Sequence, residues 1–248
     1  MDNRYTLSHP KPGQRRPRYN GLIPAGIGSF NMDYSGMIGW FFDGTGKDRE
    51  HGSIIAQLYD SYSADLGPAL HKKYVTLSFL GWRVNRKIED AAKQIVSAYQ
   101  ILTGTNGPMM GRPGIANVGL DLLGYSRGAV MALEVAHALD KCSIPVRFLG
   151  MLDPVSTGFA CFPNKMPKNV IAAWLGVKDY NKKRSIWDRN SLFRTNLSIV
   201  QNFPSHKMGF QFEQFDVDHV HFGWDELVAE SLWHAAISAG VPLNPRMK

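Results

Sequence analysis

The feature that most constrains this chain is an apolar run that passes through a glycine-flanked serine into a helical segment. Residues 118–123 have the length and composition of a buried strand, residues 124–128 are Gly-Tyr-Ser-Arg-Gly, and residues 129–136 favour a helix. Although G-x-S-x-G alone recurs by chance, this setting predicts a nucleophile elbow, in which the glycines permit a tight turn that presents Ser126. The helix N-terminus there favours the negative charge that an acyl-transfer intermediate develops.

Size and composition are those of an ordinary soluble globular protein. The chain has 248 residues, of which 44% are hydrophobic and 20% charged, so it can bury a substantial core as one large domain or two small ones. Cys142 and Cys161 are too few for a disulfide framework and lack zinc-site spacing, although one disulfide between them stays open. We expect no metal site and no cofactor.

Targeting signals are not evident in the sequence. It contains no run of about 18 apolar residues, and its basic N-terminus lacks the apolar core of a cleaved signal peptide. We therefore expect synthesis and folding in the cytoplasm. Export by a route that needs no cleaved signal stays open.

Positive charge is concentrated near the N-terminus. Lys and Arg number 28 against 21 Asp and Glu, which gives a net charge of +7. Residues 1–36 are also rich in Pro and Gly, so no regular element can extend far there. We expect a solvated basic arm over residues 1–36. A phospholipid surface as an anionic partner stays open, and nucleic acid is the less favoured partner.

Strand and helix patterns alternate through the first two thirds of the chain. Strands are predicted at 37–42, 74–80, 118–123 and 146–152, with helices at 48–64, 88–102 and 129–136. Such alternation is typical of the α/β class, with a mostly parallel central sheet covered by helices on both faces. The fold expected is α/β-hydrolase-like, in one domain over residues 37–248.

The alternation lapses between residues 154 and 194. This stretch carries several large apolar side chains and a basic cluster at 182–184, so we consider it as a lid with an apolar inner face and a basic rim, or equally as a structural insertion over the sheet. The sheet is expected to resume with strands at 196–201 and 210–212. A last helix is predicted over 227–237.

A serine nucleophile needs a histidine to accept its proton and a carboxylate to orient that histidine. Proteins with this elbow present the groups in the chain order serine, acid, histidine. Asp153 ends the predicted strand that follows the elbow, and His219 lies in a predicted loop before the last helix. Ser126, Asp153 and His219 are therefore the candidate catalytic residues.

Other residues compete for two of these roles. His221 stands two residues after His219, so the two point to the same side if the segment is extended, and spacing alone does not choose between them. His206 is a more distant rival. Asp216 and Asp218 could replace Asp153 as the acid, but neither ends an evident strand.

An oxyanion intermediate needs two N–H donors. The first is expected from Arg127, the residue after the nucleophile, and the second from a glycine-rich loop after an earlier strand, where Gly44, Thr45 and Gly46 lie. Asp43 is a candidate to orient this loop through hydrogen bonds to backbone N–H groups. A tight turn with no catalytic part is the alternative.

Two phosphate-related interpretations of residues 43–48 fail. A Walker A loop needs a glycine where Phe41 stands and a Ser or Thr where Asp48 stands. An aspartyl phosphotransferase of the D-x-D-x-T type would place its nucleophile at Phe41 as well. The loop is thus better explained by oxyanion binding.

Four segments, taken in order, resemble a formerly uncharacterised family of α/β-hydrolases with FDGT and G-[FY]-S-R-G-A motifs, which includes type VI secretion phospholipase effectors. The segments here are FDGTG at 42–46, GYSRGA at 124–129, LGMLDPV at 149–155 and DHVHFG at 218–223. In the family's last motif the histidine stands four residues before a glycine, as His219 does before Gly223. The likeness extends over residues 37–243.

The resemblance implies that Ser126, Asp153 and His219 form the triad of an ester hydrolase. It further implies lipid or phospholipid acyl esters as substrates, a role as a type VI secretion lipase effector, and a cognate immunity protein as a partner. A soluble carboxylesterase or thioesterase is one alternative. Another is a non-catalytic binding module that keeps the fold and contacts nucleic acid or a protein through its basic arm.

Overall fold

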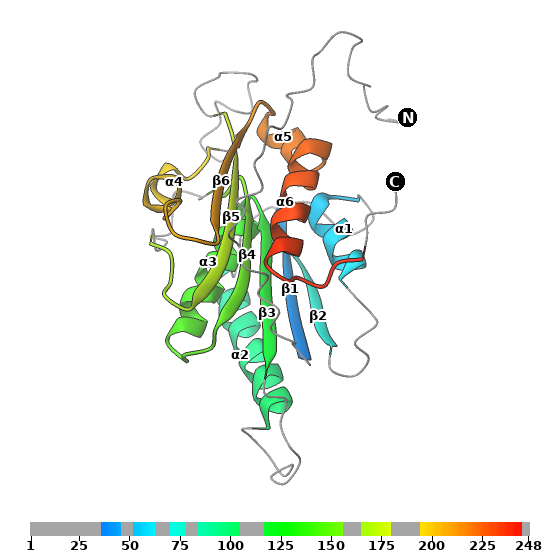
Figure 1. The fold of residues 1–248 in the computed structure, drawn as a ribbon, viewed down its shortest axis with the longest axis vertical. Coiled ribbons are helices and arrows are strands. Elements are labelled where there is room, and N and C mark those ends of the chain that lie inside the picture. The colour runs from blue at the N-terminus through cyan, green and yellow to red at the C-terminus, as the bar shows by residue number, and fades with distance from the viewer. Residues whose placement is uncertain are drawn as a thin grey trace.

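A six-stranded parallel sheet forms the centre of the molecule (Figure 1). The structure is a computed structural model that describes residues 36–45, 52–62, 70–77, 84–104, 117–155, 165–179 and 194–244. In these residues the strand order is β2-β1-β3-β4-β5-β6, and every pair is parallel. The strands are β1 (Gly36–Thr45), β2 (Leu70–Leu77), β3 (Val118–Tyr125), β4 (Val146–Leu152), β5 (Val170–Lys178) and β6 (Phe210–Phe215).

Helices cover both faces of the sheet (Figure 1). One face packs against α2 (Val84–Thr103), α3 (Arg127–Asp140) and α4 (Leu197–Asn202). The other packs against α1 (Ile54–Ser61) and α6 (Glu226–Ser238), with the single-turn α5 (His219–Phe222) between β6 and α6. The predicted α/β class is confirmed. The chain reverses its direction across the sheet between β2 and β3, and such a reversal places a crevice at the carboxyl ends of β1 and β3.

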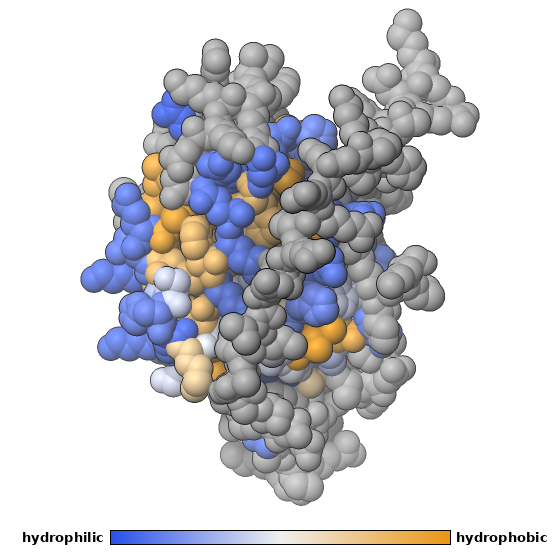
Figure 2. Space-filling view, turned by 45° about the horizontal axis from the view of Figure 1, so that its top comes forward, coloured by the Kyte–Doolittle hydropathy of each residue, from blue (hydrophilic) through white to orange (hydrophobic). Residues whose placement is uncertain are grey.

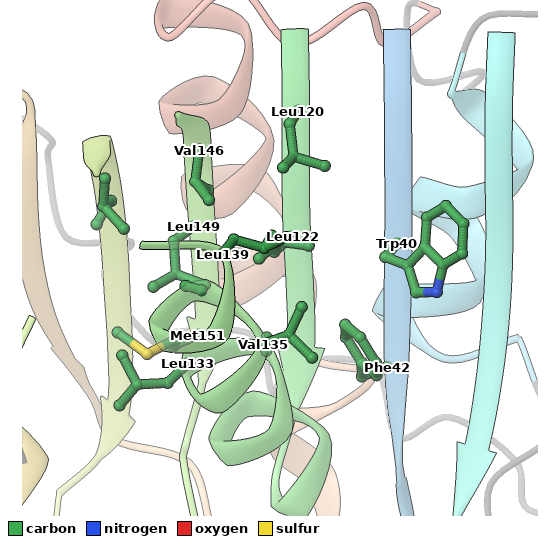
Figure 3. Close-up of a cluster of buried hydrophobic side chains, with 14 of the residues drawn as sticks. Trp40, Phe42, Leu120, Leu122, Leu133, Val135, Leu139, Val146, Leu149 and Met151 are labelled. Atoms are coloured by element: carbon green, nitrogen blue, oxygen red, sulfur yellow. The ribbon is translucent and has the colours of Figure 1, made fainter. Parts of the chain in front are cut away.

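The larger core cluster explains the apolar side chains that the central strands turn toward α3. Strand side chains from β1, β3 and β4 meet the inner face of α3 there, and each is shielded from water (Figure 3). Burying one such side chain contributes about 1.5–3 kcal/mol relative to exposure. The residues labelled in Figure 3 are Trp40, Phe42, Leu120, Leu122, Leu133, Val135, Leu139, Val146, Leu149 and Met151.

A charged pair is buried on the other face of the sheet, beside the second apolar cluster. Arg147 Nε donates to Asp121 Oδ1 at 2.9 Å, and the hydroxyl of Tyr62 donates to Asp121 Oδ2 at 2.6 Å. Gly119 leaves room for the guanidinium, because a Cβ there would lie 2.7 Å from one of its nitrogens. A buried carboxylate with these donors is compensated, and it ties β3 to β4 and to the end of α1.

Two predicted elements differ in the structure. Residues 196–201, predicted as a strand, form α4 instead, because the Asn196 side chain accepts from the N–H groups of Ser198 and Ile199 and caps a helix. The stretch 154–194 contains β5, a buried strand of the central sheet, so the lid prediction is wrong for residues 170–178. Its apolar run packs against β4 and β6 rather than over a site.

Other expectations hold or lie outside the described residues. The helix predicted over 48–64 is described from Ile54, and the strand predicted over 74–80 is described as β2, from Leu70 to Leu77. The basic arm at 1–35 and the lid segments 156–164 and 180–193 lie outside the described residues. Among the helices that the structure does describe, none combines the length and the apolar character needed to cross a bilayer.

Candidate active site

Ser126 forms a sharp turn between β3 and α3. Its φ of 57° and ψ of −121° are strained values for a residue with a side chain. The turn is held by the neighbouring strand, because Ser126 N–H donates to the Leu152 carbonyl at 2.8 Å and Val155 N–H donates to the Ser126 carbonyl at 3.2 Å. The predicted elbow geometry is therefore present at the carboxyl end of the sheet.

The two glycines of the elbow are required by close backbone contacts. A Cβ at Gly124 would lie 2.3 Å from the Gly128 carbonyl oxygen, and a Cβ at Gly128 would lie 2.0 Å from that of Phe42. Both distances are far below any tolerable contact. The G-x-S-x-G spacing thus lets β3, the start of α3 and the end of β1 pack together around Ser126.

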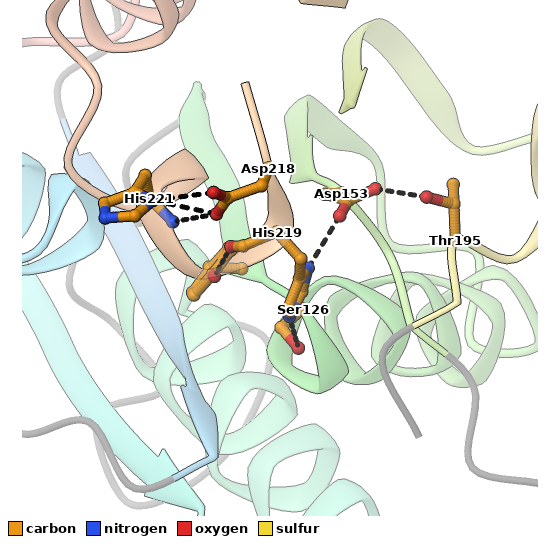
Figure 4. A network of polar contacts seen from close by, with 7 residues as sticks. Ser126, Asp153, Thr195, Asp218, His219 and His221 are labelled. Carbon is orange, nitrogen blue, oxygen red and sulfur yellow. Dashed lines mark hydrogen bonds and ion pairs between the residues drawn. The ribbon is translucent and has the colours of Figure 1, made fainter. Parts of the chain in front are cut away.

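His219 lies directly against the serine. Its Nε2 is 3.1 Å from Ser126 Oγ, and its side chain is 4% exposed (Figure 4). The residue is the first of α5 rather than part of a loop, and Asp218 caps this helix by accepting from the His221 N–H at 3.0 Å. The cap fixes the start of α5 and hence the place of the imidazole.

Asp153 completes a chain of three side chains. Its Oδ2 is 2.6 Å from Nδ1 of His219, and it stands fully buried just after β4 (Figure 4). A carboxylate at Nδ1 holds the proton there, so Nε2 is left as an acceptor for the Ser126 hydroxyl. The structure therefore brings together all three residues that the sequence proposed.

Thr195 is a fourth member that sequence reasoning missed. Its hydroxyl donates to the other carboxylate oxygen, Asp153 Oδ1, at 2.6 Å (Figure 4). An isolated antiparallel bridge between Val155 and Thr195, together with the Asn196 N–H donating to the Pro154 carbonyl at 2.7 Å, brings this segment to Asp153. No local pattern around Thr195 could have indicated it.

The rival residues are placed elsewhere. His221 turns away from Ser126 to bond Asp218, with Nδ1 at 2.9 and 2.8 Å from the two carboxylate oxygens, and its side chain is 75% exposed (Figure 4). The segment is helical, so residues at i and i+2 do not share a side. Although burial acts to raise it, hydrogen bonds from His221 lower the pKa of Asp218. His206 and Asp216 lie exposed on the surface.

Asp43 organises the end of β1, which extends to Thr45 and so includes part of the predicted loop. It is fully buried, and its Oδ1 accepts from the Gly44 N–H at 2.7 Å while its Oδ2 accepts from the hydroxyls of Ser53 and Tyr74. Ser53 is in turn the N-cap of α1, accepting from the Ala56 N–H at 3.1 Å. One carboxylate thus connects β1, β2 and α1, which fits the predicted loop-orienting role.

The end of β1 reaches the elbow. A Cβ on Gly44 would lie 3.4 Å from the Ser126 Cβ. The Gly44 N–H donates to Asp43, so among the predicted oxyanion donors Thr45, the last residue of β1, stays a candidate. Gly46 lies outside the described residues. Arg127 is the first residue of α3, where backbone N–H groups have no partner within the helix.

The geometry can carry out proton transfer without a metal ligand set. Ser126, His219 and Asp153 form one continuous hydrogen-bonded line in which each donor has an acceptor. Within the ranges of the chain that the structure describes, no group of three or more His, Cys, Asp or Glu is arranged to hold a metal ion.

Comparisons with known proteins give similarity of fold only. No family model matches the chain, and no curated protein matches it. Among solved structures, a protein assigned to the alpha/beta hydrolase superfamily from Xanthomonas campestris pv. campestris has a TM-score of 0.49 at 12% identity, covering 84% of this chain and 97% of that one.

Two further structures have similar scores. A hormone-sensitive lipase from a metagenome library has a TM-score of 0.46 at 14% identity, covering 84% of this chain and 78% of that one. The RedJ thioesterase of the prodiginine biosynthetic pathway of Streptomyces coelicolor has 0.46 at 12%, covering 83% and 91%. The assignment of the active site therefore depends on the geometry of this chain and not on these similarities.

Proposed function

We propose that this protein is a serine hydrolase that cleaves carboxylic esters, with Ser126 as nucleophile, His219 as general base and Asp153 as the group that orients His219. One observation carries the proposal. The imidazole of His219 bridges the two others, with Nε2 at 3.1 Å from the Ser126 hydroxyl and Nδ1 at 2.6 Å from the Asp153 carboxylate. Burial of all three keeps these bonds away from competing water.

In the proposed acylation step, Ser126 Oγ attacks the acyl carbonyl as its proton moves to Nε2 of His219. The carbonyl oxygen becomes an oxyanion, which the N–H groups of Arg127 and Thr45 are proposed to stabilise. Asp153 stabilises the imidazolium formed. When the tetrahedral intermediate collapses, the C–O bond to the alcohol breaks and His219 gives the leaving oxygen its proton.

The second half of the cycle uses the same groups. A water molecule attacks the carbonyl carbon of the acyl-serine as its proton moves to Nε2 of His219, which gives a second tetrahedral intermediate. When this intermediate collapses, the C–O bond to Ser126 Oγ breaks and the free acid is released. Ser126 recovers its proton from His219. No group outside the described side chains is needed for the proton balance.

Among esters, we propose lipid or phospholipid acyl esters as substrates. The support is the four-motif resemblance, together with an exposed apolar side chain next to His219 in the chain, because Val220 is 40% exposed on α5. The face turned forward in Figure 2 likewise carries hydrophobic patches between hydrophilic ones. A lipid surface is the corresponding partner.

The biological role proposed from the same resemblance is that of a type VI secretion lipase effector. Such an effector is made in the cytoplasm, exported without a cleaved signal, and neutralised in the producing cell by an immunity protein. Co-purification with the protein expressed from a neighbouring gene of the producing genome tests the last point.

Fluorophosphonate labelling combined with an ester screen tests the enzymatic proposal. Wild-type protein should label, and Ser126→Ala should lose both labelling and turnover, with kcat lower by about 10⁴-fold or more. The matched control is Ser205→Ala, because Ser205 is exposed and lies in a turn after α4. A non-catalytic binding module would not label at all.

A second assay is needed to identify the substrate class. Phospholipid vesicles and soluble short-chain esters and thioesters are assayed side by side with the same preparations. Fatty-acid release from vesicles supports the lipid proposal. Turnover of soluble esters or thioesters alone would replace it with a soluble carboxylesterase or thioesterase.

A further inference from the structure

Tyr125, the residue before the nucleophile, packs against the imidazole of His219. Its ring lies 5.3 Å from the His219 ring between centroids, with an angle of 21° between the planes. This is a stacked arrangement rather than an edge contact. The phenol is buried at the end of β3, so the stack is shielded from water.

A second contact joins the same two residues. The Tyr125 hydroxyl donates to the backbone carbonyl oxygen of His219. Burial raises the pKa of Tyr125 well above its usual value, and the negative charges of Asp153, Asp43 and Asp218 raise it further. The phenol therefore stays protonated and remains a donor around neutral pH.

Two glycines from distant segments make room for this ring. A Cβ at Gly44, near the end of β1, would lie 2.7 Å from the ring, and a Cβ at Gly223, after α5, would lie 3.0 Å from it. Gly223 also anchors α5, because its carbonyl accepts from the Ile54 N–H of α1 at 2.7 Å. The same steric requirement thus explains both motif glycines: a side chain at either position would prevent the Tyr125 ring from packing against His219.

The helix that carries His219 needs such support. α5 is four residues long and supplies little structure of its own. Its imidazole must nevertheless hold two hydrogen bonds at once, to Ser126 and to Asp153. Contacts with the ring face and with the carbonyl of the same residue constrain both the side chain and its backbone.

We propose that Tyr125 is a positioning residue for His219, which it holds in line between Ser126 and Asp153 through ring stacking and through the hydrogen bond to the His219 carbonyl. The inference rests on the proposed role of His219 as general base. Since Tyr125 and Ser126 are consecutive, one rigid dipeptide carries both the nucleophile and the support of its base.

The test compares two substitutions at Tyr125 with a matched control. Tyr125→Phe keeps the ring and removes the hydroxyl, and Tyr125→Leu removes the stack. The control is Tyr62→Phe, because Tyr62 is equally buried and also donates to a buried acceptor, Asp121, outside the site. Each protein is assayed for kcat and KM on a soluble ester, for thermal midpoint, and for the proton NMR resonance of the His219 Nδ1–H.

Misplacement of a catalytic group costs up to about 100-fold in rate. We expect kcat of Tyr125→Leu to fall by about that factor with KM nearly unchanged, and its Nδ1–H resonance to broaden through exchange with water. Tyr125→Phe should recover most of kcat and keep the resonance. Tyr62→Phe should lower the thermal midpoint and leave kcat as in the wild type.

Two results would overturn the inference. One is a wild-type kcat and a sharp resonance in Tyr125→Leu, and the other is a loss of kcat that follows the thermal midpoint in all three variants. Should the wild type show neither turnover nor fluorophosphonate labelling, the proposed function fails. The resonance still decides the positioning role in that event, because it reports the hydrogen bond from His219 to Asp153 without any substrate.

Discussion

Thr195 and Asp153, 42 residues apart in the chain, are joined by a hydrogen bond of 2.6 Å between hydroxyl and carboxylate. With His219 on Oδ2 and Thr195 on Oδ1, both oxygens of a fully buried carboxylate have a donor. A buried acceptor that loses its donor costs about 1–3 kcal/mol. The carboxylate that orients the proposed base is thus itself held from a second segment.

Replacement of Thr195 by Val should weaken both stability and turnover. We expect unfolding free energy lower by about 1–3 kcal/mol and kcat lower by about 10-fold, because the Asp153 carboxylate can rotate away from His219. Urea unfolding and steady-state kinetics measure the two effects. Thr195→Ser, which keeps the hydroxyl, is the control, and equal kinetic losses in Val and Ser variants would contradict the role of this hydrogen bond.

Substitution of the two neighbouring histidines should affect kcat very differently. His219→Gln removes the proposed proton acceptor, and we expect kcat to fall by about 10³-fold or more. His221→Gln changes an exposed ring that bonds Asp218, so kcat should stay within about twofold, as for most exposed sites. Steady-state kinetics on one ester compares the two. A larger loss in His221→Gln would reassign the base.

A single methyl group at Gly128 should disrupt the elbow. The Cβ of Gly128→Ala would meet the Phe42 carbonyl at 2.0 Å, so β1 and α3 must separate at a cost of more than about 2 kcal/mol. Gly52→Ala is the control, since a Cβ there meets nothing within 4 Å and strains only a positive φ of 64°. Thermal unfolding should show a clearly larger loss for Gly128→Ala. Equal losses would contradict the role of the contact with Phe42.

Glu134 on α3 should make stability depend on pH. Burial raises the pKa of Glu134 to about 7, with a smaller opposing effect from Lys141. An acid that is harder to ionise in the folded state binds more protons there than when unfolded, so stability is fullest below the unfolded value near 4.5 and declines as pH rises toward 7.

The variant Glu134→Gln removes this titration. We expect its thermal midpoint to exceed that of the wild type by a few degrees at pH 8 and to equal it at pH 4, with the effect limited because the group is only half-buried. Thermal scans across that range measure it. A difference between the proteins that does not change with pH would show that ionisation of Glu134 does not affect stability.

The sequence by itself determined what depends on neighbours along the chain. The apolar run of β3 ending in two glycines around Ser126 predicts the strand, the tight turn and the helix, because each follows from local periodicity and backbone freedom. The candidacy of Ser126, Asp153 and His219 follows from their chain order of serine, acid and histidine, and from the position of Asp153 at the end of the strand after the elbow. The α/β class follows from the same alternation.

Local signals were misleading where two interpretations of the same residues competed. Residues 196–201 have a strand-like composition, yet the Asn196 cap selects a helix. The buried strand β5 was hidden in a stretch whose apolar residues suit a lid equally well. Between His219 and His221, an extended segment would have placed both rings on one side, and the single turn of α5 separates them.

Only the tertiary structure decided which polar groups converge on the site. The Thr195 hydroxyl reaches Asp153, and the Tyr125 ring reaches His219, through packing between segments that share no local pattern. The tertiary structure also decided that the Gly44 N–H donates its hydrogen bond to the Asp43 carboxylate. The physical reason is that hydrogen bonds and stacking require distances of a few ångströms in space, whereas sequence periodicity specifies only which side of its own strand or helix a residue occupies.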